Sequence, residues 1–201
     1  MKIAKLEEIN KLYFTVDDLA RALCITVSSA KVSASRYFSA GYILRIKRGA
    51  YVLKSRWNNL TEPEIFTLAN MIQVPSYISL LTALSYYGVT TQLQQGYIES
   101  ISLKRTKSTE TGGIFFSYTR IGKKLYRGFS RKEGVFIASP EKAFLDVLYL
   151  SLLGKYSFDT ASIDKRKLNA DEIKRLVGFF PKKVKNEVKR WMSLKNMKPW
   201  K

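Results

Sequence analysis

Apolar residues recur every three positions along the start of the chain, at Ile3, Leu6, Ile9 and Leu12. This spacing predicts a first helix. A second helix is expected to begin after Thr15, whose hydroxyl can cap it together with Asp18 three residues on, and to end near Leu23. The pattern predicts a third helix over residues 28–41, which a glycine terminates.

Two short β-type runs follow the third helix. Residues 42–46 (YILRI) and 50–53 (AYVL) predict two strands, and the Lys-Arg-Gly sequence between them predicts a tight turn. Three helices followed by a hairpin are typical of a winged helix-turn-helix. We therefore expect residues 1–57 to form such a domain.

The pattern changes at residues 56–61, where an asparagine pair indicates a linker. Thr61 and Pro63 then predict the start of a helix that reaches about Ile72. The later runs predict a helix within 76–88, strands at 96–103, 113–119 and 134–139, and helices at 140–153, 170–180 and 181–195. We expect a second domain over residues 61–201, a mixed α/β domain with a small sheet flanked by helices, and an α+β fold for the chain.

Charge is distributed unevenly along the 201 residues. Thirty-five Lys and Arg against sixteen Asp and Glu give a net charge of +19. Residues 1–60 carry a net charge of +7 and residues 165–201 carry +10, whereas residues 61–164 carry only +2. A surface of this sign attracts polyanions, so we expect a partner such as nucleic acid or an acidic protein face.

The composition argues against catalysis. The chain has no histidine and one cysteine, Cys24, so it lacks the usual zinc and copper ligands and the commonest general acid or base. The strand runs contain one carboxylate, Glu99, where a metal-dependent nuclease or nucleotidyltransferase needs a pair. Asp146 lies in an otherwise apolar helix and is expected to pair with a cation or with backbone N–H groups. We expect no enzyme, no cofactor and no metal site.

The sequence also predicts a location in the cell. The first eleven residues are charged and amphipathic, so no secretory signal is visible. The most apolar stretches, 74–90 and 143–153, are too short or too interrupted by polar residues to span a bilayer. A single cysteine cannot form an internal disulfide and suits a reducing compartment. We expect a cytoplasmic protein without a membrane partner.

The third helix has two contrasting faces. At about 100° per residue, the expected core side collects Val27, Ala30, Ala34, Tyr37 and Phe38. The opposite side collects four hydroxyls, a valine and an arginine, with Lys31 on the flank: Ser28, Ser29, Val32, Ser35, Arg36 and Ser39. Short hydroxyls let a helix lie close in the major groove of DNA, where Val32 can touch a thymine methyl and Arg36 a phosphate or guanine edge.

The predicted hairpin adds three cations near its glycine turn, Arg45, Lys47 and Arg48. An arginine at such a tip can enter a neighbouring minor groove. We therefore interpret the third helix and the hairpin as a surface that binds double-stranded DNA. The alternative is that these side chains are ordinary solvated surface, or that the domain binds another protein.

The last predicted helix combines an apolar side, formed by Val184, Val188 and Trp191, with a basic side. The basic side carries Lys182, Lys183, Lys185, Lys189 and Arg190. These cations could contact DNA, an acidic protein face or an anionic membrane, and a solvated surface is the simplest alternative. Because a net charge of +10 exceeds what solubility requires, we favour a polyanion or partner contact.

Four stretches carry a resemblance to a known family: RIKRGAYVL at 45–53, PSYISLLTALSYYGVTTQ at 75–92, YIESISLKR at 97–105 and FIASPEKAFLDVLYL at 136–150. They resemble the AbiEi antitoxins of bacterial abortive-infection toxin–antitoxin pairs, and the second and fourth stretches are the more specific. The resemblance covers most of the chain. The family pattern often has a histidine at the position of Tyr87, so the tyrosine is a departure.

The resemblance implies an N-terminal domain that binds operator DNA and represses its own operon. It also implies a C-terminal domain that counters a nucleotidyltransferase toxin, by direct contact or without a stable complex. The alternative is a stand-alone winged-helix transcriptional regulator with an undetermined C-terminal partner or ligand domain. A neighbouring nucleotidyltransferase gene would favour the antitoxin.

Overall fold

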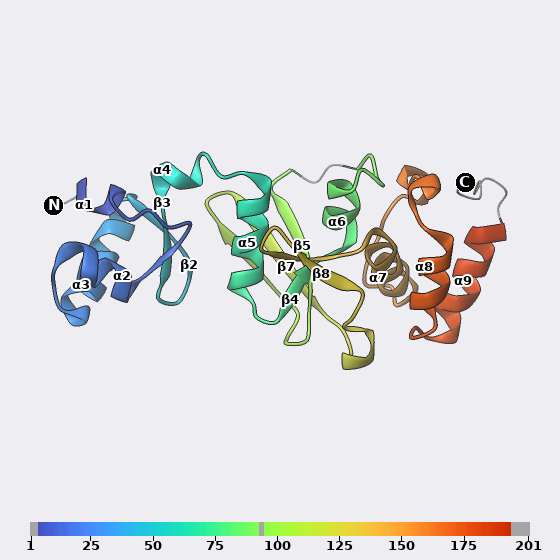
Figure 1. Ribbon diagram of the computed structural model, residues 1–201. Coiled ribbons are helices and arrows are strands. Elements are labelled where there is room, and N and C mark those ends of the chain that lie inside the picture. Colours follow the sequence, from blue (N-terminus) through green and yellow to red (C-terminus); the bar gives the residue numbers. More distant parts are fainter. Residues whose placement is uncertain (1–3, 93–94, 194–201) are drawn as a thin grey trace.

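The computed structural model describes residues 4–92 and 95–193. Figure 1 shows an elongated molecule with helices at both ends and β-strands between them. The fold is mixed α+β, as the sequence predicts, with a 3-stranded sheet and a 6-stranded sheet. Among the described residues, no helix combines the length and the apolar character needed to cross a bilayer.

The N-terminal part of the chain has its own small sheet. Its elements are α1 (Ala4–Glu7), β1 (Phe14–Thr15), α2 (Val16–Leu23), α3 (Val27–Ser39), β2 (Ile43–Lys47), β3 (Ala50–Leu53) and α4 (Lys54–Trp57). Strand β3 pairs antiparallel with β1 on one side and with β2 on the other. The second and third helices and the hairpin lie where the sequence predicts them. The first helix ends at Glu7, so Ile9 and Leu12 of the predicted helical pattern lie between α1 and β1.

Buried side chains of α2, α3 and the small sheet form a first core. It includes Leu19, Leu23, Ala30, Ala34, Tyr37 and Ile43. The members from α3 confirm most of the predicted core side of that helix. The assignment of Val27 and Phe38 to the core is wrong, since they are 43% and 49% exposed. Both lie within two residues of an end of α3, where neighbouring elements no longer cover the helix.

The larger sheet has the strand order β6-β7-β5-β4-β9-β8. The strands are β4 (Ser76–Ile78), β5 (Tyr97–Ser102), β6 (Lys107–Thr111), β7 (Ile114–Arg120), β8 (Phe129–Lys132) and β9 (Val135–Ala138). The pairs β5–β7 and β4–β9 are parallel, and the other pairs are antiparallel.

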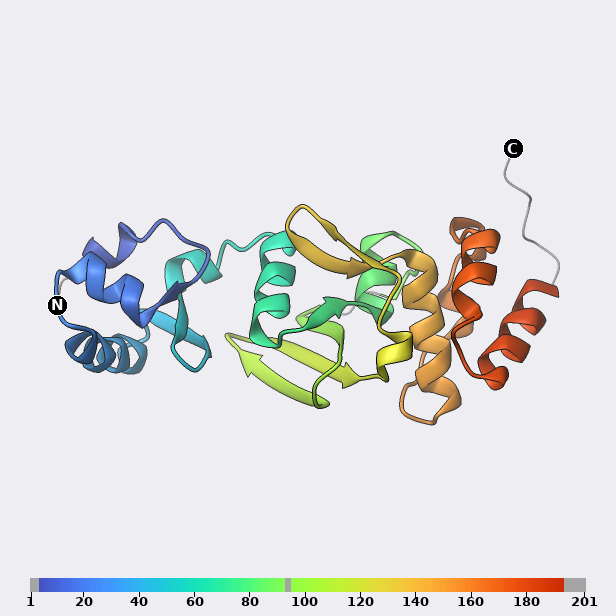
Figure 2. The same ribbon diagram turned by 60° about the horizontal axis from the view of Figure 1, so that its bottom comes forward.

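Helices cover this sheet and extend the molecule beyond it. They are α5 (Glu62–Ile72), α6 (Leu80–Tyr86), α7 (Pro140–Leu152), α8 (Ala170–Val177) and α9 (Lys182–Ser193), with short 3₁₀ turns η1 (Lys123–Leu125), η2 (Thr160–Ser162) and η3 (Lys165–Lys167). Figures 1 and 2 show α7 between the sheet and the α8–α9 pair. The α8–α9 pair therefore lies at the opposite end of the molecule from α3.

The predicted helix within residues 76–88 is confirmed as α6, and the sequence pattern missed the short strand that precedes it. Residues Ser76–Ile78 form β4, and α6 begins only at Leu80. Residues Ser76–Ile78 would be buried in a helix or in a strand, so their apolar character does not distinguish the two. They form a central strand because β4 pairs with β5 on one side and with β9 on the other. The pattern also missed the edge strands β6 and β8, because their sequences KSTET and FSRK are mostly polar.

Helix α7 is buried on almost every side, as its composition predicts. Ser139 caps it by accepting a hydrogen bond from the backbone N–H of Lys142. Lys142 and Asp146, one turn apart, form a fully buried ion pair. The Asp146 carboxylate also accepts hydrogen bonds from the hydroxyls of Tyr77 at 3.0 Å and Ser79 at 2.9 Å. Asp146 is therefore paired, as expected, and it ties α7 to the β4–α6 segment.

The two sheets meet at a junction formed by α4 and the β2–β3 hairpin. Ile46 and Val52 of the hairpin and Trp57 of α4 pack into the core of the larger sheet rather than into the first core. The indole Nε1 of Trp57 donates a hydrogen bond to the carbonyl oxygen of Gly112 at 3.1 Å, in the turn between β6 and β7. The N-terminal elements are thus fixed to the large sheet by burial and by hydrogen bonding.

Candidate nucleic-acid interface

Local interactions in α2 set up the entry to α3. Thr15 and Asp18 form a capping box, as predicted, in which each side chain accepts the other residue's backbone N–H. Burial opposes ionisation of Asp18, but hydrogen bonds from Lys11, Thr15 and Arg21 hold its pKa well below the ordinary value. Cys24, in the left-handed conformation, ends α2 and begins a three-residue turn into α3. A short turn of fixed conformation therefore joins α2 to α3.

Hydroxyl groups occupy the first turn of α3. Thr26 caps the helix by accepting the N–H of Ser29, and its hydroxyl also lies 2.9 Å from the hydroxyls of Ser28 and Ser29. A hydroxyl has one hydrogen, so Thr26, which donates to Ser29, must accept from Ser28. Ser29 therefore keeps its own hydrogen for an outside acceptor, next to the positive end of the helix dipole.

The predicted binding face of α3 is exposed along its length. The exposed side chains are those of Ser28, Ser29, Lys31, Val32, Ser35, Arg36 and Ser39. Val32 is 52% exposed, although it is apolar. Neither Lys31 nor Arg36 forms an ion pair with any described residue. The face can therefore offer hydroxyl donors, two uncompensated cations and one apolar contact to a partner.

The three cations of the hairpin differ in their contacts, although the sequence groups them together. Arg45, Lys47 and Arg48 are all exposed, and Gly49 adopts a positive φ of +75° in the turn. The Lys47 ammonium donates a hydrogen bond to the carbonyl oxygen of Met71 at 2.9 Å, at the end of α5. Lys47 therefore faces the end of α5, whereas Arg45 and Arg48 have no ion-pair partner among the described residues.

Sequence reasoning missed a group of cations on the strands and turns of the larger sheet. Nine of the eleven basic residues between positions 61 and 164 fall within residues 104–132, where Glu110 is the only acidic residue. Averaging charge over residues 61–164 conceals them, because the flanking stretches are acidic. A shorter window over the sequence LKRTK at residues 103–107 would have revealed the start of this group.

The basic residues of α9 belong to a separate surface. Lys182, Lys183, Lys189 and Arg190 are exposed and Lys185 is half-buried, while Val184, Val188 and Trp191 are buried as predicted. Arg190 lies 3.5 Å from Glu187, and the four lysines form no ion pair with a described residue. Figure 1 places α9 and α3 at opposite ends of the molecule, so the fold does not join the two basic surfaces.

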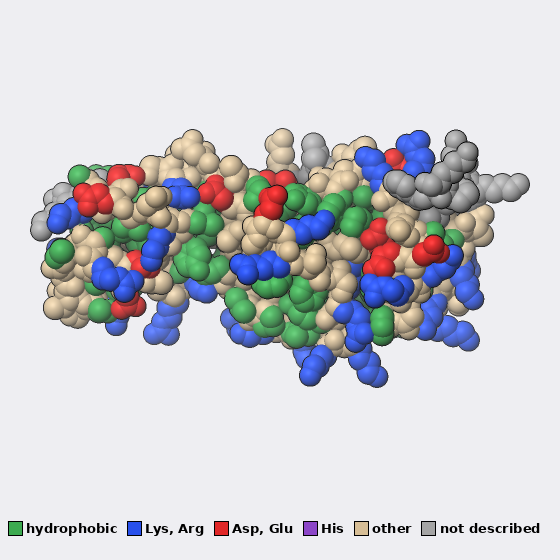
Figure 3. All heavy atoms as spheres, viewed as in Figure 1, with side chains coloured by type: hydrophobic (Ala, Val, Ile, Leu, Met, Phe, Trp, Pro, Cys, Tyr) green, Lys and Arg blue, Asp and Glu red, His purple; other side chains and the backbone are tan. Residues whose placement is uncertain are grey.

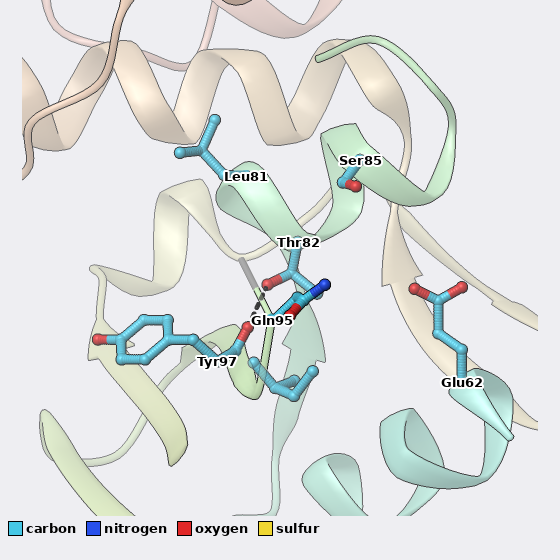
Figure 4. Close-up of a pocket in the computed structure, with 7 residues that line it drawn as sticks. Glu62, Leu81, Thr82, Ser85, Gln95 and Tyr97 are labelled. Carbon is cyan, nitrogen blue, oxygen red and sulfur yellow. Dashed lines mark hydrogen bonds between the residues drawn. The ribbon is translucent and has the colours of Figure 1, made fainter. Parts of the chain in front are cut away.

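A small hollow lies between α6 and the start of β5. Figure 4 shows Thr82 and Ser85 of α6, Tyr97 of β5, Gln95 and Glu62 around it. Its volume is about 230 Å³, below the range of about 300–1,000 Å³ that is usual for small-molecule sites. Its side chains offer a single charge, that of Glu62. The hollow does not indicate a small-molecule reaction.

Neither a metal-binding group nor a similar known protein helps to assign a function. Within residues 4–92 and 95–193, no group of three or more His, Cys, Asp or Glu side chains is placed to hold a metal ion. No family model matches the chain, and comparisons with curated proteins and with solved structures likewise found no match. The geometry of α3, the hairpin and α9 is therefore the basis for a functional proposal.

Proposed function

We propose that this chain binds operator DNA through an N-terminal winged helix-turn-helix, residues 1–57, and acts as an AbiEi-type antitoxin that represses its own operon. The observation that carries the proposal is the exposed face of α3. On that face two cations without ion-pair partners among the described residues, Lys31 and Arg36, alternate with short hydroxyls around an exposed Val32.

Duplex DNA is the polyanion that this face fits best. An α-helix has the width of the major groove, and small side chains let its backbone approach the base edges. Lys31 and Arg36 supply phosphate contacts, and Val32 supplies an apolar contact for a thymine methyl. In a winged helix-turn-helix, α2 and α3 are the two helices of the motif and the β2–β3 hairpin is the wing.

The antitoxin part of the proposal rests on the resemblance of two motifs. The stretch 75–92 spans β4 and α6, and the stretch 136–150 spans β9 and α7. These elements pack against one another, since β4 pairs with β9 and Asp146 binds the hydroxyls of Tyr77 and Ser79. The two most specific stretches of the resemblance therefore lie side by side in the fold. The expected partner is a cognate nucleotidyltransferase toxin.

Fluorescence anisotropy with labelled duplexes tests the DNA-binding part. The probes are the region upstream of the chain's own gene and a scrambled duplex of equal length, each titrated at several salt concentrations. We expect Lys31→Ala with Arg36→Ala to weaken binding about tenfold and to reduce the slope of log affinity against log salt by about two, because about 0.9 counterion is released per phosphate contact. Val32→Ala should lower the preference for the upstream duplex and leave the salt slope unchanged.

A matched control removes two exposed lysines at the other end of the molecule, Lys155→Ala with Lys174→Ala. If this control weakens binding as much as the α3 variant, the effect is one of net charge and the assignment of α3 is wrong. Co-expression with a neighbouring nucleotidyltransferase distinguishes the two functions: restored growth supports the antitoxin, and repression without protection supports a stand-alone regulator.

A further inference from the structure

The large sheet carries basic side chains that the proposed winged domain does not include. They lie in the connection between β5 and β6, at the start of β6, at the end of β7 and in η1: Lys104, Arg105, Lys107, Arg120, Lys123 and Lys124. None of them forms an ion pair with a described residue. Glu110, the nearest acidic residue along β6, is three positions from Lys107, about 10 Å along the strand.

The fold brings the first of these cations to the tip of the hairpin. Lys47 donates to the carbonyl oxygen of Met71, and two residues further along, the Gln73 side chain donates to the carbonyl oxygen of Arg105, each at 2.9 Å. The end of α5 thus holds both the hairpin tip and the β5–β6 connection. A hydrogen bond from the Thr111 hydroxyl to the carbonyl oxygen of Arg45, at 3.4 Å, links the other end of β6 to β2 of the hairpin.

Like charges are crowded at this place. Lys107 is half-buried against the ring of Tyr118, with its ammonium 5.5 Å from the ring centroid. Burial and the nearby charges of Arg105, Lys47 and Lys104 lower the pKa of Lys107. Mutual repulsion of this kind costs folding stability unless an anion compensates for it.

The basic surface continues beyond the winged domain in space. In Figure 3, Lys and Arg side chains project along the lower edge of the molecule, from the part that contains α3 across the region of the large sheet. Figure 1 places α3 and the tip of the β2–β3 hairpin on this same lower side. A straight polyanion that contacts α3 can therefore continue past the hairpin tip.

We propose that Lys104, Arg105 and Lys107 form, together with Lys47, a phosphate-binding surface that extends the DNA contact of α3 onto the large sheet. This inference rests on the proposed function, because the ligand is the sugar–phosphate backbone of the same duplex. Its contribution is independent of base sequence, since ammonium and guanidinium groups on phosphates position a duplex without reading it. An acidic protein partner is the alternative occupant.

The test uses the full chain with Lys104→Ala and Arg105→Ala. Both side chains are exposed, and the backbone groups that they contribute to the fold remain. We expect affinity to fall about tenfold on the upstream and the scrambled duplex alike, and the salt slope to fall by about two. The ratio of the two affinities should stay constant, unlike in Val32→Ala. The temperature of unfolding should not fall, because the variant removes repulsion.

Two controls make the outcomes distinct. Lys104→Arg with Arg105→Lys keeps both charges and should retain the wild-type salt slope, and Lys155→Ala with Lys174→Ala removes two charges elsewhere. If the α3 variant loses affinity while Lys104→Ala with Arg105→Ala keeps the wild-type affinity and salt slope, this inference is overturned and the proposed function stands. If the wild-type chain binds neither duplex, both are overturned. Loss of binding to an acidic partner with unchanged DNA binding also overturns it.

Discussion

At the scale of single residues, Glu99 is the least ordinary ionisable group. It is only 3% exposed, and its carboxylate accepts hydrogen bonds from the Tyr156 hydroxyl at 2.9 Å and from the backbone N–H of Leu81 at 3.0 Å. Burial raises its pKa to about 7, more than these hydrogen bonds lower it. The folded protein therefore holds a proton on Glu99 at pH values where the unfolded chain has released it.

This shift predicts a stability that falls as pH rises. The protonated Glu99 favours the folded state below the unfolded pKa of 4.5, and this contribution is lost as pH rises towards 7. We expect the free energy of unfolding in urea to decrease by on the order of 2–3 kcal/mol between pH 5 and pH 8. The chain has no histidine, and the lowered pKa values of Asp18 and Glu64 affect stability only at lower pH. Burial also raises the pKa of Asp146, which acts on stability in the same direction as Glu99.

Glu99→Gln is the matched variant, because its amide oxygen can still accept a hydrogen bond while it carries no charge. Its free energy of unfolding should fall less between pH 5 and pH 8 than that of the wild type, and it should be more stable than the wild type at pH 8. A wild-type chain whose stability does not change over this range would show that Glu99 is ionised throughout.

At the scale of elements, α9 serves both the core and the surface. Its apolar side is anchored by Trp191, whose ring lies 4.6 Å from that of Phe144 in α7. Its other side carries Lys182, Lys185 and Lys189 at positions i, i+3 and i+7, a stripe about 10 Å long. Deleting residues 182–201 would remove the buried side as well, so charge reversal is the informative change.

If the proposed antitoxin function holds, Lys182→Glu with Lys189→Glu should reduce protection from the toxin in co-expression. The temperature of unfolding should stay within a few degrees, because both side chains are exposed. Trp191→Ala, in contrast, should lower the free energy of unfolding by about 3 kcal/mol. Growth measured under toxin induction and calorimetry separate the two effects. If the charge-reversed chain still protects cells fully, the lysines of α9 are ordinary solvated surface and contact no partner.

At the scale of the whole molecule, a glycine controls the junction between the sheets. A Cβ built on Gly112 would lie 2.4 Å from Nε1 of Trp57 and 2.8 Å from Cδ1 of Leu44. Gly112 also has a positive φ of +54°, which costs a residue with a side chain about 1–2 kcal/mol. A side chain here would push α4 and the hairpin away from the β6–β7 turn.

Gly112→Ala should therefore cost more stability than Gly113→Ala, its neighbour. Gly113 has a φ of +84° and open space around its Cβ position, so it reports strain alone. We expect Gly113→Ala to cost about 1–2 kcal/mol and Gly112→Ala at least 1 kcal/mol more, from the added steric overlap. Calorimetry provides the measurement. Equal losses of stability in the two variants would mean that Trp57 and Leu44 can move away from the added methyl group without destabilising the fold.

The sequence by itself determined the local features of this protein. The capping residues Thr15, Thr61 and Ser139, the hairpin turn and the amphipathic pattern of α9 predicted their elements, because caps, turns and helix faces depend on residues a few positions apart. The exposed face of α3 was predicted for the same reason.

Only the tertiary structure decided which distant residues meet. The assignment of Ser76–Ile78 to a central strand depended on β5 and β9, which lie about 20 and 60 residues away. The placement of Lys47 near the Lys104–Lys107 segment depended on the junction at Trp57 and the end of α5. Such contacts follow from strand order and packing, which a local pattern of apolar and polar residues does not encode.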